Sequence, residues 1–337
     1  MIREAIQALV TGKSLSADEA AQVMDEIMEG QVTPAQFGAF VTALRLKGET
    51  VEEISGMART MRAKAIKVNV ADQVIDVVGT GGDGLNSFNI STVTAFVVAG
   101  AGLKVAKHGN RAASGQCGSA DVLEALSVKI TLNAEQVQKC IEEVGIGFMF
   151  APTFHPAMKY AGPPRKEIGI RTVFNILGPL TNPAGAKHYL LGVADGALVE
   201  KMALVLKSLG CEHALVVHGE DGLDEITISG PSQVCELKSG SLKKFTVSPQ
   251  DFGLQTASLD SLKGDNAEHN AAILRSILCG DKGPRSDVVL MNAAAALVAG
   301  DKVKTLKQGM DLATESITSG QALAKLEHLI KLSNSFT

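Results

Sequence analysis

Four glycines and several small polar residues follow a strand-like run near residue 76. The stretch reads DVVGTGGDGLNSFNIST over residues 76–92, and Gly79, Gly81 and Gly84 match the spacing G-x-G-x-x-G. Glycines allow backbone N–H groups to converge on an anion, and the N-terminus of a following helix adds its positive dipole end. The stretch is therefore typical of a dinucleotide site, of another kind of phosphate cradle, or of a plain turn between a strand and a helix.

The dinucleotide interpretation does not fit the surrounding residues. A dinucleotide fold starts its helix inside the glycine motif and holds the ribose with an acidic residue about 20 positions on. Here we expect the first helix cap at Ser91 or Thr92, and the later position carries the basic strip KVAKHGNR. No G-K-[ST] follows the glycines, so the nucleotide loop with that signature does not fit either. A phosphate cradle remains as the prediction, with the plain turn as its alternative.

A second strip, KHGNRAASG over residues 107–115, follows another strand-like run. It contains two cations, two small polar side chains and two glycines at Lys107, Arg111, Asn110, Ser114, Gly109 and Gly115. Cations that meet an anion in a pocket form charge-assisted hydrogen bonds with it. A solvated basic loop is the alternative, but the glycines favour an anion site. By itself, His108 is more typical of a packed histidine than of a catalyst.

A third strip carries two adjacent carboxylates. Asp224 and Glu225 lie between the run HALVVHG at 213–219 and the run ITIS at 226–229. Hard oxygen ligands of this kind suit magnesium, which often bridges carboxylates to substrate phosphates. The alternative is a hairpin loop with exposed acids, which is what we expect of Glu220 and Asp221. Both interpretations of the pair remain open at this point.

The elements that position these strips are predicted by caps and periodicity. Residues 1–70 are expected to be helical, because Ser16 with Glu19 and Thr50 with Glu53 have capping-box spacing and Thr33 precedes Pro34. Further along, short apolar runs alternate with helical stretches, which predicts an α/β fold with a mainly parallel central sheet. The expected strands cover 74–78, 104–107, 213–219 and 226–229, and the expected helices include 92–102, 120–126, 197–210 and 287–300.

Composition limits the class of protein. The chain has 337 residues, 45% of them hydrophobic, no Trp and a net charge of −4. That charge argues against a general nucleic-acid or membrane-surface binder, and no segment reaches the apolar length of a membrane span. The five cysteines are scattered without a C-x-x-C pair, which disfavours a disulfide framework or a cysteine zinc site. We expect a soluble cytoplasmic protein.

Together the strips resemble the anthranilate phosphoribosyltransferases. The resemblance runs from about residue 3 to residue 330 and rests on four long motifs and the acidic pair Asp224-Glu225. The motifs are DVVGTGGD (76–83), FNIST (88–92), KHGNRAASG (107–115) with Ser119, and GIRTVFNILGPLTNP (169–183). The chain departs from the family pattern at GPPRK (162–166), where A-P-V-R-R is usual, and at Ser127, where glycine is common.

The resemblance implies a reaction and a set of site residues. The family joins the amine of anthranilate to C1 of 5-phosphoribosyl-1-pyrophosphate (PRPP), releasing pyrophosphate, with Mg²⁺. The residues implied for PRPP are Gly79, Gly82, Asp83, Ser87, Asn89, Ile90, Ser91, Thr92, Lys107, His108, Gly109, Asn110, Arg111, Ala112, Ala113, Ser114, Gly115 and Ser119. Those implied for Mg²⁺ are Ser91, Asp224 and Glu225, and those for anthranilate are Gly79, Asn110 and Arg165, with His108 and His155 along its path.

The family also implies an organisation and partners. A small helical domain over residues 1–70, completed by a helical segment around 165–182, joins an α/β domain over 71–337. Homodimers form through the helical part, and a glutamine amidotransferase subunit of anthranilate synthase is left open as a further partner. Because the amine of anthranilate is already neutral at pH 7 and the departure of pyrophosphate is the harder step, we expect catalysis by electrostatic stabilisation and positioning, with no side chain assigned as acid or base.

Two other functions compete with this one. A pyrimidine nucleoside phosphorylase has a similar fold but reads K-H-S where this chain has K-H-G-N-R at 107–111. A non-catalytic nucleic-acid-binding relative is expected to have an extended basic face and an incomplete PRPP motif set. This chain is slightly acidic and carries every motif, so both alternatives are disfavoured.

Overall fold

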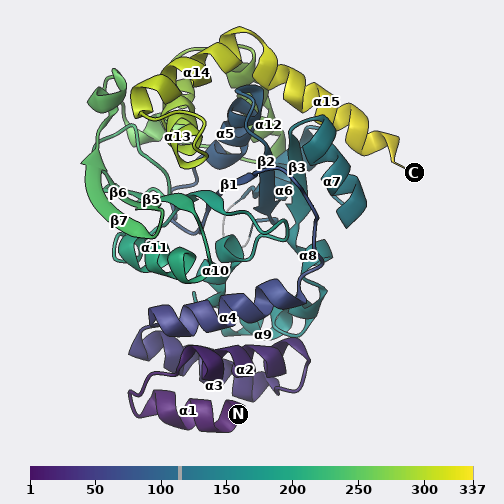
Figure 1. Cartoon of the computed structure of the whole chain (residues 1–337), viewed down its shortest axis with the longest axis vertical. Helices are drawn as coiled ribbons and strands as arrows, with labels where there is room; N and C mark the ends of the chain where they lie inside the picture. Colours follow the sequence, from purple (N-terminus) through teal and green to yellow (C-terminus); the bar gives the residue numbers. More distant parts are fainter. Residues whose placement is uncertain (113–115, 337) are drawn as a thin grey trace.

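The chain begins with a stack of four helices. The structure is a computed structural model that describes residues 1–112 and 116–336. The helices are α1 (Ile2–Val10), α2 (Ala17–Met28), α3 (Pro34–Lys47) and α4 (Val51–Lys64). They lie together at one end of the molecule, with the N-terminus at its tip (Figure 1). The helical character predicted for residues 1–70 is confirmed up to Lys64, and residues 65–70 form no helix. Helix α1 has no side-chain cap from which the sequence could have predicted its start.

The predicted helix starts are confirmed in this stack. The side chains of Ser16, Thr33 and Thr50 each accept a hydrogen bond from the backbone N–H three residues on, in complete capping boxes. Glu53, in the box of α4, is fully buried, where its carboxylate accepts a hydrogen bond from Leu15 N at 2.9 Å and pairs with Lys47 Nζ at 2.9 Å. The capping residue Glu53 therefore also connects α4 to the loop before α2, through its hydrogen bond with Leu15.

Glycine allows α2 and α4 to pack at close range, which leads to a stability prediction. A Cβ on Gly56 of α4 would collide with the backbone carbonyl of Ala17, whereas a Cβ on Gly38 of α3 would lie 3.8 Å from the nearest atom of Ile168. We expect Gly56→Ala to lower the free energy of unfolding by about 1–3 kcal/mol through overpacking. The matched control Gly38→Ala is expected to raise it, by up to about 1 kcal/mol. Urea unfolding followed by circular dichroism measures both, and a stabilising Gly56→Ala would contradict the packing.

The rest of the chain is built on a seven-stranded sheet in the order β3-β2-β1-β4-β5-β6-β7. Neighbours from β3 to β5 pair in parallel, and β6 and β7 add an antiparallel hairpin at one edge. The predicted mainly parallel sheet is confirmed. The strands are β1 (Ile75–Gly79), β2 (Val105–Gly109), β3 (Ile146–Phe150), β4 (His188–Gly192), β5 (His213–Gly219), β6 (Ser232–Lys238) and β7 (Ser241–Val247).

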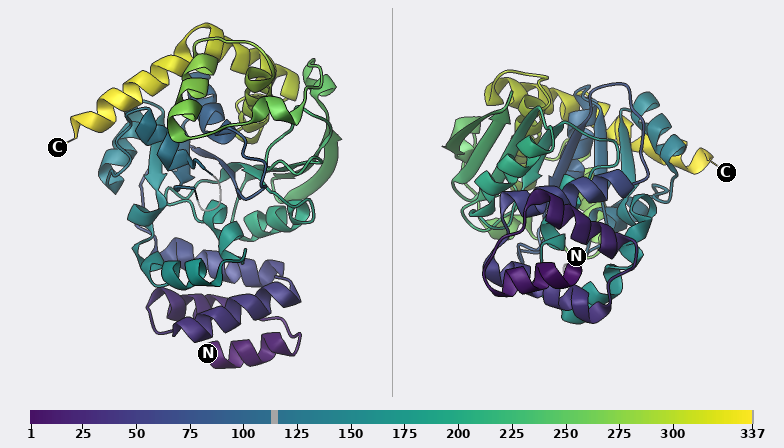
Figure 2. Two further views of the ribbon diagram at one scale, coloured as in Figure 1. Left: turned by 180° about the vertical axis from the view of Figure 1, so that it is seen from behind. Right: turned by 60° about the horizontal axis from the view of Figure 1, so that its bottom comes forward.

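Helices cover both faces of this sheet. The small-residue helix α13 packs against β4 and β5, and α5 packs against β1, on the face away from the helical stack. On the other face α11 lies against β5 and β6 and also touches α4 (Figure 2). The helices of this part are α5 (Ile90–Gly100), α6 (Ser119–Ala125), α7 (Ala134–Glu143), α8 (Ala151–Phe154), α11 (Leu198–Ser208), α12 (Ala267–Leu278), α13 (Pro284–Ala299), α14 (Leu306–Thr318) and α15 (Gln321–Ser335).

The strand expected over residues 226–229 is wrong. This buried segment is irregular and pairs with no strand of the described chain. Its polar groups are satisfied by side chains instead: Asn292 of α13 bonds both the N–H and the carbonyl of Ile226, and Thr227 donates to Asp221 at 2.5 Å. Asp221 is consequently not the exposed hairpin acid that the sequence indicated. Apolar β-branched residues indicated burial here, but the hydrogen bonds come from scattered partners, among them Asn292 and the Ser232 hydroxyl, and not from the backbone ladder of a neighbouring strand.

The proline-rich segment after β3 returns to the helical stack. Its helices are α9 (Gly162–Ile168) and α10 (Phe174–Leu177), with short 3₁₀ turns at Pro156–Lys159 and Gly178–Leu180. α9 packs against α3, and α10 packs against α4. Within the described residues, no helix is both long and apolar enough to cross a membrane, and all five cysteines are free.

A buried polar anchor joins this segment to the centre of the sheet. Asn182 Nδ2 donates to Asp76 Oδ2 at 2.7 Å and to the carbonyl of Ala106 at 2.8 Å. Asp76, on β1, also accepts from the backbone N–H of His108 at 3.3 Å. Burial raises the pKa of Asp76 to about 6, against the opposing influence of Lys107. The anchor fixes β1 and β2 side by side, and the predicted site residues emerge from the carboxyl ends of these two strands.

Candidate active site

The glycine loop leaves the carboxyl end of β1 in a left-handed conformation. Gly81, Gly82 and Gly84 have φ values of 66°, 71° and 77°, a region in which a Cβ is strained. The N–H of Gly81 donates to Asp224 Oδ2 at 2.7 Å. The first and third of the predicted strips therefore meet, although they are more than 140 residues apart in the chain.

Two glycines make room for Asp224. A Cβ on Gly79, the last residue of β1, would collide with the Asp224 carboxylate, and one on Gly192, the last residue of β4, would collide with its backbone carbonyl. Neighbouring parallel strands end at the same edge of the sheet, so both glycines face the acidic loop. Gly79 is thus needed for close approach to Asp224, whether or not it also contacts a ligand.

Three carboxylates gather at this edge. Glu225 is buried and Asp224 is half-buried. Burial, followed by the charge of Asp83, raises the pKa of Asp224 to about 6. Burial and then the charge of Asp224 raise the pKa of Glu225 well above its ordinary value. Asp83 Oδ2 is itself buried and has no hydrogen-bond partner in the described part of the chain. The exposed-hairpin alternative for Asp224 and Glu225 is therefore wrong.

This donor set fits a magnesium ion. The carboxylates supply the hard oxygen ligands that Mg²⁺ prefers. The buried Asp83 Oδ2 has no hydrogen-bond donor among the described residues, and a bound cation would satisfy it. The hydroxyl of Ser91 lies close to these carboxylates. It accepts a hydrogen bond from Lys107 Nζ at 3.3 Å, and the charges of Asp224 and Glu225 affect the pKa of the same lysine. The fit rests on donor chemistry and on clustered negative charge.

Lys107 is the cation buried in this cluster. It stands on β2, and its Nζ donates to the carbonyl of Val77 at 2.7 Å as well as to Ser91. Burial lowers the pKa of Lys107, while Asp76, Glu225 and Asp224 oppose that effect. Two protein acceptors leave the ammonium group one further N–H for a ligand.

The helix that faces the loop starts two residues earlier than the predicted range of 92–102. α5 begins at Ile90, which is buried, and its N-cap is Asn89, not Ser91 or Thr92. The Asn89 side chain does not cap the helix. It donates to the carbonyl of Cys117 at 3.1 Å and accepts from Asn270 at 3.0 Å. Thr92 Oγ1 is buried with no partner among the described residues.

The outer part of the glycine loop rests on a segment that the sequence did not indicate. Ser87 forms an isolated antiparallel bridge with Lys263, and the N–H of Phe88 donates to the carbonyl of Leu262 at 2.9 Å. The N–H of Gly264 in turn donates to the carbonyl of Asn86 at 2.8 Å. Backbone pairing of this kind depends little on residue type, so no sequence motif predicts it.

The second strip lies at the same edge, after β2. A Cβ on Gly109 would collide with the Ser119 hydroxyl, and that hydroxyl donates to the carbonyl of Asn110 at 3.3 Å. Asn110 Oδ1 accepts from the N–H of Arg111 at 2.8 Å. The N–H of Ala112 donates to Asp121 at 3.0 Å. The predicted residues Ala113, Ser114 and Gly115 lie outside the described residues.

Carboxylates of α6 hold the charged end of Arg111. Its guanidinium pairs with Asp121 at 2.9 Å and with Glu124 at 2.5 Å, both on α6, and it lies 5.6 Å from the ring centre of Phe150. These exposed ion pairs cost little to break. A phosphate that reached this strip would therefore compete with two carboxylates for Arg111.

His108 and His155 form a buried pair beside this strip. Their ring centres are 5.1 Å apart. His108 Nδ1 is bonded to the carbonyl of Gly178 at 3.2 Å, and His155 Nε2 to that of Thr181 at 3.1 Å. Burial lowers the pKa of His108 to about 3 and that of His155 to about 4. Both rings are neutral, and each has one buried nitrogen with no described partner, His108 Nε2 and His155 Nδ1.

Arg165 is a half-buried cation of α9. Its guanidinium carbon lies 5.2 Å from the ring centre of Phe174, and burial lowers its pKa. Within residues 1–112 and 116–336 its side chain makes no hydrogen bond or ion pair. An unpaired guanidinium held against an aromatic ring suits a ligand carboxylate. In space, α9 belongs to the helical stack, across from the sheet edge (Figure 1).

The sequence did not identify Arg171 as a site residue. Its guanidinium donates to the carbonyls of Gly82 and, at 3.1 Å, Gly81, and its own carbonyl accepts from Arg45 of α3 at 2.6 Å. Because C=O and N–H of a trans peptide point in opposite directions, the N–H groups of Gly82 and Asp83 face away from Arg171. Neither donates to an acceptor in the described residues. The sequence feature that could have identified Arg171 is the motif GIRTVFN, in which this arginine stands two residues after the first glycine.

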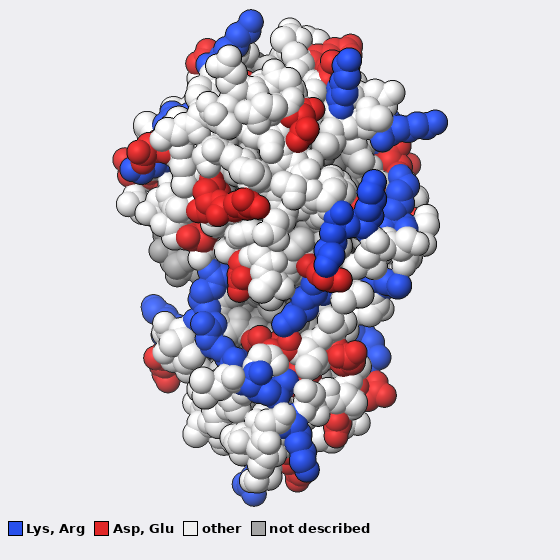
Figure 3. Space-filling model, turned by 90° about the vertical axis from the view of Figure 1, so that its left-hand side faces the viewer, with Lys and Arg blue, Asp and Glu red and all other residues white. Residues whose placement is uncertain are grey.

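The arrangement as a whole has the donor groups expected of an anion site, with a carboxylate cluster beside them. Free N–H groups, Lys107 and the start of α5 face one edge of the sheet, and the three carboxylates lie among them. The surface is hollowed between the helical stack and the α/β part, with Lys and Arg side chains gathered around the hollow (Figure 3). Such a site can hold a doubly charged phosphate compound together with a divalent ion.

Comparisons with known proteins agree along the whole chain. Residues 3–65 match the helical bundle domain of a glycosyl transferase family, and residues 71–323 match the a/b domain of that family. The anthranilate phosphoribosyltransferase of Dehalococcoides mccartyi is 62% identical over 99% of both chains, and that of Chloroflexus aggregans is 58% identical over 98% of both.

Solved structures give the same result. Anthranilate phosphoribosyltransferase from Thermus thermophilus superposes with a TM-score of 0.93 at 45% identity, covering 98% of this chain and 99% of that one. The Saccharomyces cerevisiae enzyme in complex with PRPP and Mg superposes with a TM-score of 0.91 at 30% identity, covering 99% and 98%. With the fold, the carboxylate cluster and the motif-bearing loops all in agreement, the chain belongs to the anthranilate phosphoribosyltransferase family.

Proposed function

We propose that this protein transfers the phosphoribosyl group of PRPP to the amine of anthranilate. The products are N-(5-phosphoribosyl)anthranilate and pyrophosphate, in the pathway to tryptophan. The observation that carries the proposal is the meeting of the glycine loop, Lys107 and the Asp83, Asp224 and Glu225 carboxylates at one sheet edge. Family membership supports the identity of both substrates.

The proposed work of the PRPP side is to stabilise the departing pyrophosphate. Lys107 supplies a buried positive charge, and the N–H groups of Gly82 and Asp83 supply neutral donors. The carboxylates and Ser91 would hold Mg²⁺, which when bound neutralises negative charge on the pyrophosphate and so makes it a better leaving group. The phosphate oxygens of PRPP would draw Arg111 away from α6 and toward the strip at 107–115.

On the anthranilate side, the proposal assigns orientation and no proton transfer. Arg165 would bind the substrate carboxylate, with Asn110 and Gly79 nearer the reacting amine. His108 and His155 are neutral at physiological pH because burial lowers their pKa values, so their bare nitrogens can accept hydrogen bonds without adding charge. An aromatic amine is already neutral at pH 7, and positioning it near C1 supplies much of the acceleration.

Arg171 is proposed to orient the glycine loop, and this leads to a prediction. Arg171→Gln should raise the KM for PRPP by roughly tenfold, because at least one charge-assisted hydrogen bond to the loop is lost. The KM for anthranilate and the kcat should change less. Steady-state kinetics with each substrate varied in turn measures this, with the exposed Arg275→Gln as control. An unchanged KM for PRPP would contradict the role of Arg171.

The proposal extends to assembly and domains. We assign residues 1–70 and the segment 165–182 to one helical domain and the remainder of 71–337 to the α/β domain. A homodimer through the helical domain would cover the exposed Leu46 and Val10, which are 83% and 61% accessible. Five free thiols suit the reducing cytoplasm.

The direct test uses the fluorescence of anthranilate. Purified protein is mixed with anthranilate, PRPP and Mg²⁺, and loss of fluorescence that requires all three, and stops when Mg²⁺ is chelated, is the expected result. Omission of PRPP and heat-inactivated protein are the controls. A folded protein that leaves anthranilate unchanged but releases a base from a pyrimidine nucleoside in the presence of phosphate would overturn the proposal in favour of a phosphorylase.

A further inference from the structure

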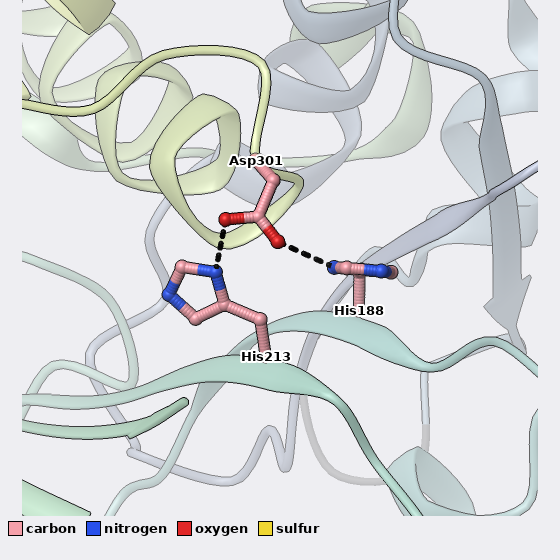
Figure 4. A group of neighbouring side chains, drawn as sticks. All are labelled: His188, His213 and Asp301. Carbon is pink, nitrogen blue, oxygen red and sulfur yellow. Dashed lines mark hydrogen bonds and ion pairs between the residues drawn. The ribbon is translucent and has the colours of Figure 1, made fainter. Parts of the chain in front are cut away.

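A second cluster of ligand-type side chains lies at the opposite edge of the sheet from the candidate active site. His188 opens β4 and His213 opens β5, and the two residues are register partners in neighbouring parallel strands. Asp301 comes from the loop after α13 and points between them (Figure 4). The strands are five and seven residues long, so about 15–20 Å of strand separates this cluster from the catalytic edge.

The ligand atoms of these three residues are close to the spacing of a metal site. One nitrogen of each imidazole and the Asp301 carboxylate all lie within 4.8 Å of one another. His213 Nδ1 is 2.9 Å from Asp301 Oδ1, and His188 Nδ1 is 3.9 Å from Asp301 Oδ2. Ligands of a tetrahedral zinc ion with bonds of 2.0–2.1 Å are about 3.3 Å apart. The two observed distances bracket that value.

The outer nitrogens of both rings face further carboxylates. His213 Nε2 is 3.0 Å from Glu236 Oε1, and His188 Nε2 is 3.9 Å from Glu212 Oε2. Metal-binding histidines almost always donate their second N–H to a carboxylate, a carbonyl or water, which fixes the ring and raises its basicity. Here each ring has one nitrogen toward Asp301 and the other toward a glutamate. That double arrangement indicates more than a pair of packed histidines.

From these contacts we propose that His188, His213 and Asp301 bind a transition-metal ion of the zinc class. The ion would be held by the two Nδ1 atoms and the Asp301 carboxylate, with Glu236 and Glu212 orienting the rings. Imidazole with one carboxylate suits Zn²⁺, Ni²⁺ and Cu²⁺ better than Mg²⁺. Both histidines are almost fully buried, whereas Asp301 is half exposed, so an ion enters from the Asp301 side. Its role is structural, joining the loop after α13 to β4 and β5.

Three adjustments accompany ion binding. His188 Nδ1 is bonded to the carbonyl of Ala299 at 2.8 Å, so its proton has to move to Nε2. The exposed Glu212 side chain, whose Oε2 is 3.9 Å from Nε2, has to move closer to accept a hydrogen bond from it. Lys238 Nζ, 2.7 Å from Asp301 Oδ1, has to leave that carboxylate. Lys238 is more than half exposed, so it swings into solvent at little cost. Lys238 therefore competes with the metal, and this competition makes the proposal testable.

Binding of Zn²⁺ alone is the first measurement. Chelator-treated protein is titrated with Zn²⁺ against a chromophoric zinc chelator, in excess Mg²⁺ to occupy oxygen-ligand sites. We expect one Zn²⁺ per chain and a rise in the thermal unfolding midpoint with Zn²⁺. Co²⁺ should give the intense visible absorption of a tetrahedral site. The double variant Asp224→Asn/Glu225→Gln should bind Zn²⁺ as the natural chain does, which separates this site from the catalytic one.

Variants assign the ligands. Asp301→Asn, which keeps the left-handed backbone that asparagine tolerates, should weaken Zn²⁺ binding at least tenfold, as should His188→Gln and His213→Gln. Glu236→Gln should weaken it about 10–100-fold. The exposed His328→Gln is the matched control. If His213→Gln fails to fold, the Zn²⁺ affinities of Asp301→Asn and Glu236→Gln are sufficient to test the proposed ligands.

Lys238→Met separates a metal site from a self-sufficient ion-pair network. Without the competing ammonium group, Zn²⁺ should bind more tightly than to the natural chain. If the cluster is only an ion-pair network, Lys238→Met lowers the thermal unfolding midpoint. In that case Zn²⁺ does not raise the midpoint of the natural chain or of the Lys238→Met variant. Stoichiometric binding that survives Asp301→Asn, or no binding by the natural chain, overturns the proposal.

Discussion

Replacing Asp224 with Asn and Glu225 with Gln together is expected to lower kcat/KM for PRPP by about 10³-fold or more, with a folded protein remaining. Removing a single preorganised group that stabilises charge commonly costs about 10²–10³ in rate, and here two proposed ligands for Mg²⁺ are removed at once. The measurement is the anthranilate fluorescence assay across a range of Mg²⁺ concentrations. Raising Mg²⁺ should recover little of the rate, since the ligands themselves are gone.

The fold should tolerate this double change. The amide that replaces the Asp224 carboxylate would retain an oxygen to accept the N–H of Gly81, and the two substitutions relieve repulsion among three clustered carboxylates. Without Mg²⁺, the thermal midpoint should therefore not fall. Glu220→Gln, in the same loop but exposed, is the control and should keep full activity. A rate within tenfold of the natural chain would refute the placement of the metal.

Arg165→Gln is expected to raise the KM for anthranilate by about 10–100-fold, with little change in the KM for PRPP. The reason is the loss of charge-assisted hydrogen bonds to the substrate carboxylate, each worth about 1.5–3 kcal/mol. Arg165→Lys should recover only part of the affinity, because a single ammonium group cannot match both carboxylate oxygens. Steady-state kinetics with anthranilate varied at saturating PRPP gives these constants.

A neutral substrate analogue makes this test specific. Anthranilamide lacks the carboxylate, so its KM should hardly differ between the natural chain and Arg165→Gln. A merely structural role of Arg165, through its stacking on Phe174, would impair both substrates alike. The neighbouring Lys166→Gln is exposed and serves as the matched control. Equal losses with anthranilate and anthranilamide would rule out the carboxylate contact.

Interactions between near neighbours in the chain could be predicted from the sequence. The capping boxes at Ser16 and Thr50 form as expected, because the cap and its partner are three residues apart, and Thr33 caps the helix that begins at Pro34, as expected. The small-residue helix expected over 287–300 forms as α13. Ser127, noted where the family commonly has glycine, has a φ of 68°, and this left-handed backbone is the physical reason for glycine there.

Elements whose hydrogen bonds come from afar could not be predicted in the same way. The run at 226–229 has the composition of a strand, yet Asn292 and Asp221 satisfy it as an irregular segment. β4 went unnoticed among the prolines and glycines before it, although it lies between β1 and β5 in the centre of the sheet. Residue type indicates burial, but whether a strand or a side chain supplies the partner depends on the tertiary fold.

The same distinction between local and long-range contacts applies to the candidate site. By itself, the sequence determined the family, and it predicted a phosphate-binding glycine loop and an acidic metal-binding pair, because these depend on residue types within short motifs. Only the tertiary structure decided that Asp224 lies against Gly79, that α6 carboxylates hold Arg111, and that Arg171 donates to carbonyls of the glycine loop. It also brought His188, His213 and Asp301 together. Those contacts join residues far apart in the chain, and only packing of the sheet and its helices sets their distances.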